Sequence, residues 1–290
     1  MIRMTWYNLA LFSLFAYGIQ NFLYKVAAEK KCNTAWVMVA MMTTITVLGA
    51  VFFIVSGAQI TNLSLLLFLS FTGGPLFLAS LAARTEALKN ASTSVVYPIT
   101  RFSVILVVLF SIVYFREHLS MYQIAGIGLA VIVFVLLTRH NHEERARHAD
   151  FRAGVILAVI ALVTGAGATI ISKFAAESFE EFFSFIAISN AINIFLALGI
   201  KNKLQREREN PKHTNAIIIG VLSGLFNFVG YYAIMHALAA GPLSIIAAVH
   251  SMNFVIAILL AVLIYKEELT KTRLAGIGLT VLALILLRLS

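Results

Sequence analysis

The chain contains EHLSMYQIAGIGL at residues 117–129 and EELTKTRLAGIGL at residues 267–279, so one pattern occurs twice, 150 residues apart. Near the start of each half, KVAAE at residues 25–29 resembles KFAAE at residues 173–177. A similar spacing at both ends of the repeat indicates an internal duplication. The 290 residues therefore divide into two related halves.

The amino-acid composition is that of a protein embedded in a lipid bilayer. The sequence is 60% hydrophobic and only 12% charged, with a mean hydropathy of +0.92. A water-soluble domain of this composition would expose far more apolar surface than globular proteins do. The sequence therefore predicts an all-α integral membrane protein.

Ten windows are long and apolar enough to cross a membrane, a task that needs about 20 residues for about 30 Å of hydrocarbon. They lack the polar and apolar alternation of a β-barrel wall, so helices are expected. The approximate cores are Trp6–Tyr24, Ala35–Val55, Leu63–Leu81, Val95–Phe115, Met121–Thr138, Gly154–Ser172, Phe182–Ile200, Thr214–Ala237, Leu243–Tyr265 and Leu274–Leu287.

Five spans fall in each half, and an odd number turns the second half upside down relative to the first. We predict two inverted five-helix repeats, residues 1–138 and 153–290, around a central cavity, joined by a cytoplasmic linker at residues 139–152. Inverted repeats can exchange conformations, so that a central site faces first one side of the membrane and then the other. The architecture therefore favours transport by alternating access.

The positive charges of the sequence gather on one face of the predicted bundle. Most of the 22 lysines and arginines lie in the loops on the side opposite the two termini. These loops are residues 25–31, 84–89, 139–152, 201–212 and 266–273. Because positive residues in short loops stay in the cytoplasm, we expect an inner-membrane protein with both termini on the outer face. The net charge of +9 thus reflects topology, and no nucleic-acid partner is expected.

Metal and cofactor chemistry find little support in the sequence. Cys32 is the single cysteine, which excludes an internal disulfide and a cysteine metal cage. His140, His142 and His148 lie in the polar linker, where we interpret them as solvated residues. No metal and no cofactor is expected.

The end of each half resembles the EamA-type proteins of the drug/metabolite transporter superfamily. The similarity rests on a span, a short turn containing Glu117 or Glu267, and AGIGL opening the next span at 125–129 and 275–279. The resemblance implies a ten-helix basket whose cavity is lined by the first, third and fourth helices of each half. It also implies that the fifth and tenth helices pack at the edge.

Small residues mark the two helices that open with AGIGL. Gly126, Gly128, Gly276 and Gly278 remove side chains, which lets membrane helices approach closely. We interpret all four as packing residues rather than as ligand-binding residues.

Arg101 is the main candidate for a substrate site. It lies within the fourth span, one turn after Tyr97 and beyond Pro98, which is expected to kink the helix. A guanidinium offers a planar fork of donors suited to carboxylate or phosphate. The alternative is that Arg101 pairs with another side chain, such as Glu86, and locks helices together.

Further candidates are polar residues that share a helical face. His250 and Asn253 do so on the ninth span, Asn227 and Tyr231 on the eighth, and Tyr17 and Asn21 on the first. If the family arrangement applies, these faces converge with Arg101 and Tyr97 near the middle of the membrane. Interhelical hydrogen bonding is the alternative for each of them.

Other polar residues are given packing or interfacial roles. Asn190 and Asn193, on the seventh span, are expected to pack at the periphery of the cavity. Lys25 and Lys173 lie at helix ends, from which their amines are expected to reach the membrane interface.

The sequence predicts a permease for a small polar metabolite, anionic or zwitterionic, such as an amino acid or an organic acid. A flippase for an amphipathic or lipid-linked molecule is an alternative that the sequence does not separate. A membrane-embedded enzyme is disfavoured, because the predicted spans hold no aspartate and no known catalytic pattern. The expected partners are a small-molecule substrate and the lipid bilayer, with the chain acting as a monomer or homodimer.

Overall fold

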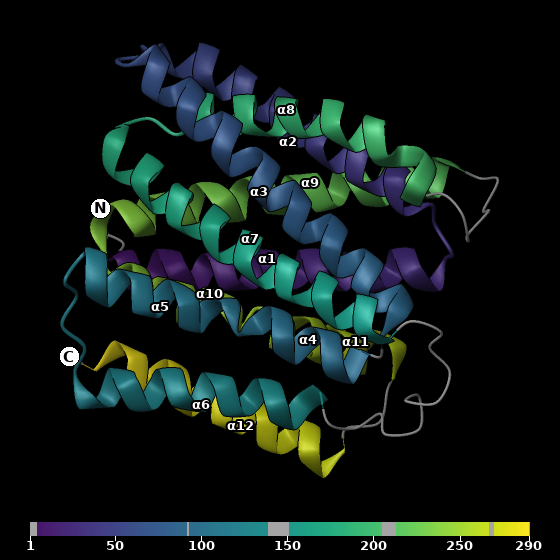
Figure 1. Cartoon of the computed structure of the whole chain (residues 1–290), viewed down its shortest axis with the longest axis vertical. Coiled ribbons are helices and arrows are strands. Elements are labelled where there is room, and N and C mark those ends of the chain that lie inside the picture. Colours follow the sequence, from purple (N-terminus) through teal and green to yellow (C-terminus); the bar gives the residue numbers. More distant parts are fainter. Residues whose placement is uncertain (1–4, 92, 139–150, 205–212, 267–269, 290) are drawn as a thin grey trace.

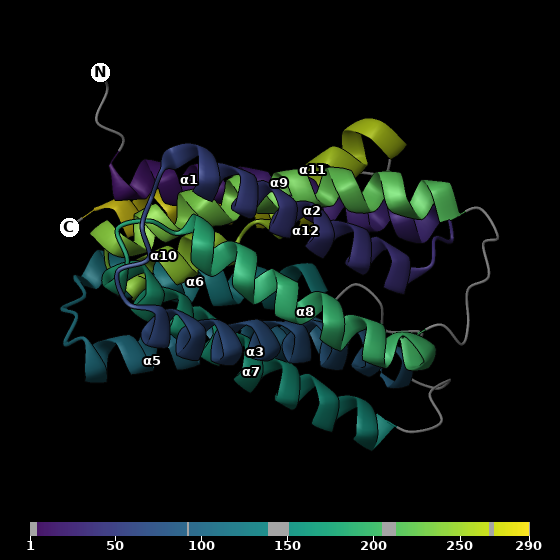
Figure 2. The ribbon, with the colours of Figure 1, turned by 90° about the horizontal axis from the view of Figure 1, so that it is seen from above.

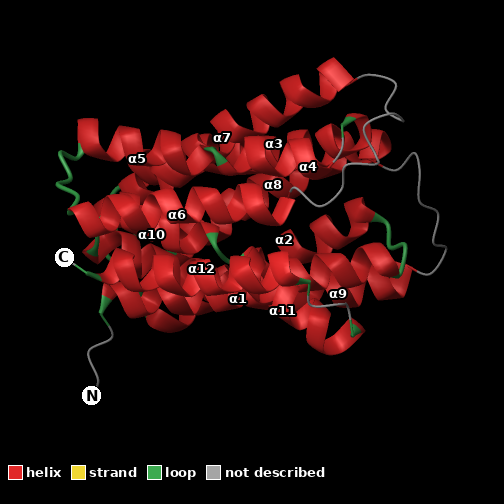
Figure 3. Cartoon of the chain, turned by 90° about the horizontal axis from the view of Figure 1, so that it is seen from below, coloured by secondary structure: helices red, strands yellow, loops and turns green. Residues whose placement is uncertain are grey.

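The computed structural model describes residues 5–91, 93–138, 151–204, 213–266 and 270–289. Within these ranges the chain forms twelve helices and no strand (Figure 3). The helices are α1 (Trp6–Glu29), α2 (Thr34–Ser56), α3 (Leu63–Asn90), α4 (Thr93–Arg101), α5 (Ser103–Tyr114), α6 (Met121–Thr138), α7 (Phe151–Ser178), α8 (Phe183–Leu204), α9 (His213–Ala240), α10 (Leu243–Ser251), α11 (Phe254–Tyr265) and α12 (Lys271–Arg288).

Local sequence explains where several helices begin and end. Asn33 caps α2, because its side-chain oxygen accepts from the backbone N–H of Ala35 at 3.0 Å. Thr5 and Thr270 cap α1 and α12 in the same way. α2 ends at Ser56 and is capped by Gly57, whose φ of +65° is a left-handed conformation that favours glycine.

The two halves interleave rather than forming separate lobes. The largest helix contacts join α3 to α7 and α1 to α9, so each pair takes one helix from either half. Figure 2 shows α1 and α9 in one layer and α3 and α7 in another. The centre of the bundle therefore belongs to both halves.

Equivalent helices run in opposite directions, as Figure 1 shows for α1 and α7. The same view places both chain ends on one side of the bundle, the terminal face. The opposite side, the charged-loop face, carries the turn from α1 to α2 and the start of α12.

The pair α6 and α12 packs together at one edge of the bundle (Figure 1). A Cβ added at Gly126 would lie 2.8 Å from Leu287 Cγ, and one at Gly276 would lie 2.6 Å from a methyl of Leu137. These two glycines pack as predicted. At Gly128 and Gly278 no described residue of the chain lies within 4 Å of an added Cβ, so the packing interpretation is wrong for them within the described bundle.

The outer surface is apolar, as lipid requires. Large side chains such as Phe68, Val113 and Phe195 are more than half exposed. Five helical segments of the described chain are long and apolar enough to cross a membrane, and three shorter apolar helices accompany them. Because an all-helical backbone satisfies its own hydrogen bonds, this surface can face hydrocarbon.

Candidate functional site

A cavity of about 250 Å³ lies between the two halves. Its walls come from α1, α3, α4, α7, α8, α9 and α10, together with Asn253 at the α10–α11 junction. Seven of the predicted site residues line it: Arg101, His250, Asn253, Asn227, Tyr231, Asn21 and Tyr17. Tyr97 belongs to α4, but its side chain lies outside the described part of the structure. The structure thus brings the predicted residues together, whereas their binding of a substrate stays a prediction.

Two spans predicted as continuous helices are broken, and the breaks occupy equivalent positions. In the first half, Phe102 N–H donates to the Ile99 carbonyl at 3.2 Å, three residues back instead of four. In the second half, Met252 N–H donates to the Val249 carbonyl at 3.1 Å. Both bonds tighten the backbone into a single 3₁₀ turn.

Proline does not explain these breaks. The break in the first half comes one turn after Pro98, where the sequence suggests a kink, but the equivalent residue in the second half is Ala248. Both halves therefore break at the same place without a shared proline, so proline is not required for the break.

Arg101 joins the two breaks. Val255 N–H donates to Met252 across the second break, which leaves the Ser251 carbonyl available to another donor. Arg101 Nη1 donates to that carbonyl at 3.3 Å. Its guanidinium also lies 5.7 Å from the Phe134 ring and 5.6 Å from the Phe254 ring, close enough for cation–π attraction. The charge is held where the halves meet, with one edge of the cavity beside it.

Histidine and asparagine side chains extend this polar centre toward α1. His250 Nδ1 lies 3.4 Å from Ser13 Oγ, and its ring meets the Tyr17 ring edge-on at a centroid distance of 4.5 Å. Asn21 donates from Nδ2 to Asn253 Oδ1 at 2.8 Å. Both predicted residues of the ninth span, His250 and Asn253, therefore contact the first span, which belongs to the other half.

A second network links α1 to α9. Asn227 donates to Gln20 Oε1 at 3.1 Å, and Gln20 donates to the Tyr24 hydroxyl at 2.7 Å. The Tyr231 hydroxyl lies 2.9 Å from Ser172 Oγ on α7. Asn227 and Tyr231 thus act in interhelical hydrogen bonds and also line the cavity.

The cavity contains polar residues that the sequence interpretation placed elsewhere. The sequence predicts Arg84 in a cytoplasmic loop, but α3 continues to Asn90, and the Arg84 side chain lines the cavity. Asn190 and Asn193 line it as well, so their assignment to the periphery is wrong. Asn193 Oδ1 is buried without a hydrogen-bond partner among the described residues. The uniform hydropathy of the seventh span gave no signal for which face turns inward.

Lys173 is buried instead of reaching the membrane interface. Its side chain is only 7% exposed, and Nζ donates to the carbonyls of Leu238 at 2.6 Å and Gly241 at 3.0 Å. Glu177 lies 3.0 Å away, one turn along α7. The amine thus stabilises the carbonyl end of α9, where the helix dipole favours a cation.

Glu117 makes the complementary contact at the next helix. Its carboxylate accepts from the backbone N–H of Leu243 at 2.6 Å and of Ser244 at 3.1 Å, at the start of α10. A carboxylate is favoured there by the unpaired N–H groups and the helix dipole. Lys173 and Glu117 together hold the α9–α10 turn on the terminal face.

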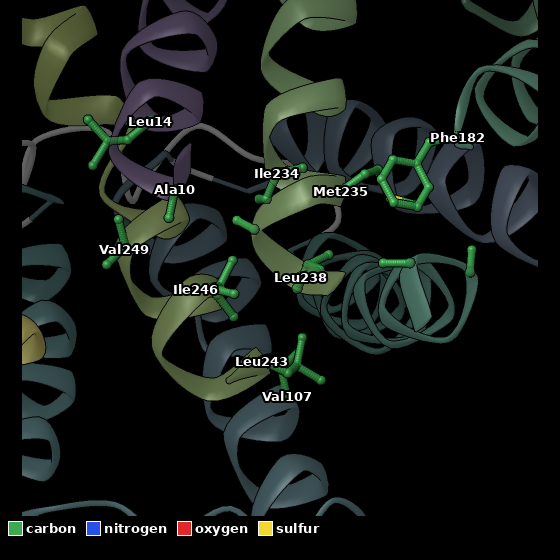
Figure 4. Close-up of a cluster of buried hydrophobic side chains, with 14 of the residues drawn as sticks. Ala10, Leu14, Val107, Phe182, Ile234, Met235, Leu238, Leu243, Ile246 and Val249 are labelled. Carbon is green, nitrogen blue, oxygen red and sulfur yellow. The ribbon is translucent and has the colours of Figure 1, made fainter. Parts of the chain in front are cut away.

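The two ends of the cavity differ in how the halves meet. On the terminal face, α10 packs along α5, and Figure 4 shows Leu243 beside Val107 among buried apolar side chains. The equivalent pair on the charged-loop face is α4 and α11, whose described residues approach far less closely, with Arg101 over the Phe254 ring where the two helices begin to diverge. The terminal end is therefore sealed more tightly than the other.

Comparison with known proteins fits this architecture. The EamA-like transporter family matches residues 4–139 and 152–289, once in each half. One solved crystal structure is similar over 96% of both chains, with a TM-score of 0.77 at 15% sequence identity, which shows the fold. No curated protein matches the chain. Because the family covers nearly the whole sequence in two copies, this multi-pass membrane protein belongs to the EamA-like transporter family of the drug/metabolite transporter superfamily.

Proposed function

We propose that this transporter moves a small polar metabolite, anionic or zwitterionic, such as an amino acid or an organic acid. The observation that carries the proposal is the Arg101 guanidinium at the edge of a cavity walled by both halves. A buried guanidinium beside a space for a ligand suits a carboxylate or phosphate group. Amides and hydroxyls around it would orient the rest of the molecule.

Alternating access is proposed from the unequal ends of the cavity. Two helix pairs at equivalent positions of the repeat, α5 with α10 and α11 with α4, differ in how closely their described residues pack. Exchange of these two arrangements would close the charged-loop face and open the terminal face. On this proposal α4 with α5, and α10 with α11, each form one span, which gives ten spans.

Uptake by purified protein in liposomes tests the function. Amino acids, carboxylates and sugar phosphates are offered as radiolabelled solutes, with empty liposomes as the control. Saturable uptake of an anion or zwitterion, competed by excess unlabelled solute, is the expected result. Transport of none of these classes, or transport of cations alone, would contradict the proposal.

The orientation is proposed from the charge of the loops and is tested separately. Cys32 is buried, and a Cys32→Ser background removes it. A cysteine introduced as Ser290→Cys is expected to react with an impermeant maleimide on intact cells, because positive loops remain cytoplasmic. Labelling only after lysis would reverse the assignment.

A further inference from the structure

The cavity carries two arginines and no acidic side chain among its described lining residues. Arg101 belongs to the first of the two helix breaks, whereas Arg84 belongs to α3, six residues before that helix ends. His250 is the other titratable basic group in the wall. The cavity is therefore electropositive around a space that a small solute can fill.

Arg84 differs from Arg101 in what surrounds its charge. Arg101 is held by the Ser251 carbonyl and two aromatic rings. Arg84 makes no hydrogen bond or ion pair with the described residues, and it is partly exposed. An arginine within a membrane helix normally pairs with an acid or a carbonyl, so an unpaired one beside a cavity is suited to a ligand.

Two positive charges around one cavity repel each other, and walls of low dielectric strengthen that repulsion. A ligand with one negative charge can contact only one of the two guanidinium groups through that charge. A ligand with two negative charges can contact both arginines of the cavity wall. The surrounding amides and hydroxyls, such as Asn190, Asn193 and Thr169, add no charge of their own.

Resting on the proposed transport function, we propose that this cavity selects small organic dianions and that Arg84 is the residue that distinguishes them from monoanions. Arg101 binds the anionic group common to both classes. Arg84 binds the second negative charge. Dicarboxylates and phosphate monoesters share this chemistry, and the probes below separate them.

Matched probes isolate the second charge. Succinate and its monoamide, succinamate, have nearly the same size but differ by one negative charge at pH 7.5. Glycerol phosphate and glycerate form the corresponding pair for phosphate esters. Initial uptake rates in proteoliposomes give KM and maximal rate for each probe. For the unmodified protein we expect a KM about tenfold lower for at least one dianion than for its monoanion partner, as one charge contact of about 1.4 kcal/mol implies.

Variants assign the selectivity to Arg84. Arg84→Gln is expected to raise the KM of the preferred dianion about tenfold while changing that of the monoanion less than about threefold. Arg84→Lys keeps the charge and is expected to restore part of the difference. Arg152→Gln removes an equal charge from an exposed position on the same face, outside the cavity, and is expected to leave both KM values unchanged.

The outcomes separate this inference from the transport function beneath it. Equal KM values for monoanion and dianion in the unmodified protein, with transport intact, would overturn the dianion inference alone. An Arg84→Gln variant that weakens both probes equally would assign Arg84 a structural role and would also overturn it. Absence of saturable uptake for every anion and zwitterion would instead overturn the proposed function.

Discussion

Lys173 and Lys25 occupy equivalent positions in the two halves, yet they sit in different surroundings. Lys173 lies 5.6 Å from the Phe115 ring and Lys25 lies 5.5 Å from the equivalent Tyr265 ring, so the repeat is preserved at both ends. Lys173 is nevertheless buried on the terminal face, whereas Lys25 is half-buried on the charged-loop face. The lysine of this repeated motif is therefore more deeply buried at the end of the cavity where the two halves pack more tightly.

The two ends of the cavity thus differ in packing although they carry similar residues. The repeat supplies each face with a lysine, an aromatic ring and a glutamate in the following turn, Glu117 or Glu267. Among the described residues, α10 nevertheless packs closely along α5, whereas α4 and α11 approach much less closely, although both faces carry this set of residues. Variants at equivalent positions can test whether the two ends exchange these arrangements.

The largest effect is expected from Arg101, which has no charged counterpart because the equivalent residue is Ser251. Arg101→Ala removes the guanidinium that joins the two helix breaks. We expect anion uptake to fall at least about 100-fold, or about 3 kcal/mol, the scale for truncating a buried charged contact. Uptake kinetics in proteoliposomes measure it.

Ser251→Ala is the matched control for that prediction. Arg101 contacts the backbone carbonyl of Ser251, which alanine retains, so uptake is expected to change less than about threefold. Unchanged transport kinetics in Arg101→Ala would contradict the anion site at this position.

The next effect concerns the sealed end. Lys173→Met leaves the Leu238 and Gly241 carbonyls without their charged donor, which is expected to cost about 2 kcal/mol of stability. The loss would also loosen the terminal face. An Ile234→Cys reporter in the cavity wall, in a Cys32→Ser background, is expected to gain labelling by an impermeant maleimide added from the terminal side.

Lys25→Met provides the comparison on the opposite face. Lys25 lies on the charged-loop face, so its loss does not loosen the contacts of the terminal face. The Ile234→Cys reporter is therefore expected to show no gain of labelling from the terminal side. Equal gains in both lysine variants would mean that the two ends do not differ as the structure indicates.

A smaller effect is expected at the α6–α12 edge, where equivalent glycines of the two halves, Gly126 and Gly276, make equivalent contacts. Gly126→Val would place side-chain atoms against Leu287 and the Ala283 carbonyl, with an expected cost of about 1 to 2 kcal/mol. Thermal unfolding in detergent measures it. Gly128→Val is the control, because no described residue lies within 4 Å of an added Cβ there, and it is expected to leave the unfolding temperature unchanged.

The smallest effect is expected from Glu117. Glu117→Ala removes the carboxylate that accepts from Leu243 and Ser244, and loss of a helix cap costs about 1 kcal/mol. Glu117→Gln keeps one acceptor and is expected to lose less. If both variants melted like the unmodified protein, the contact would not stabilise the terminal face.

The repeated motifs predicted the duplication, and their resemblance to EamA-type proteins predicted the family, because both depend on patterns that span many residues. The resemblance also predicted that Arg101, His250 and Asn227 line one cavity, in agreement with the rule that a charge or amide within an apolar span turns inward. The breaks at Phe102 and Met252 could not be predicted, because the signal at Pro98 has no equivalent in the second half.

The missed residues share a physical cause. Arg84 and Lys173 lie near helix ends, where a loop and a buried turn of helix have the same local sequence character. Only the length of α3 and the approach of the α9–α10 turn decide that these charges face inward. Such long-range contacts do not change the hydrophobic periodicity of the sequence. Basic residues at the ends of spans are therefore easily assigned to the membrane interface.

The contact between Arg101 and the Ser251 carbonyl has a consequence for how such a protein can arise. A dimer of two identical five-helix chains with perfect twofold symmetry would carry either no guanidinium or two at this position. Two would face each other where a single one now meets a peptide oxygen. Fusion of the copies into one polypeptide removes that constraint, and so permits an odd number of charges beside the symmetry axis.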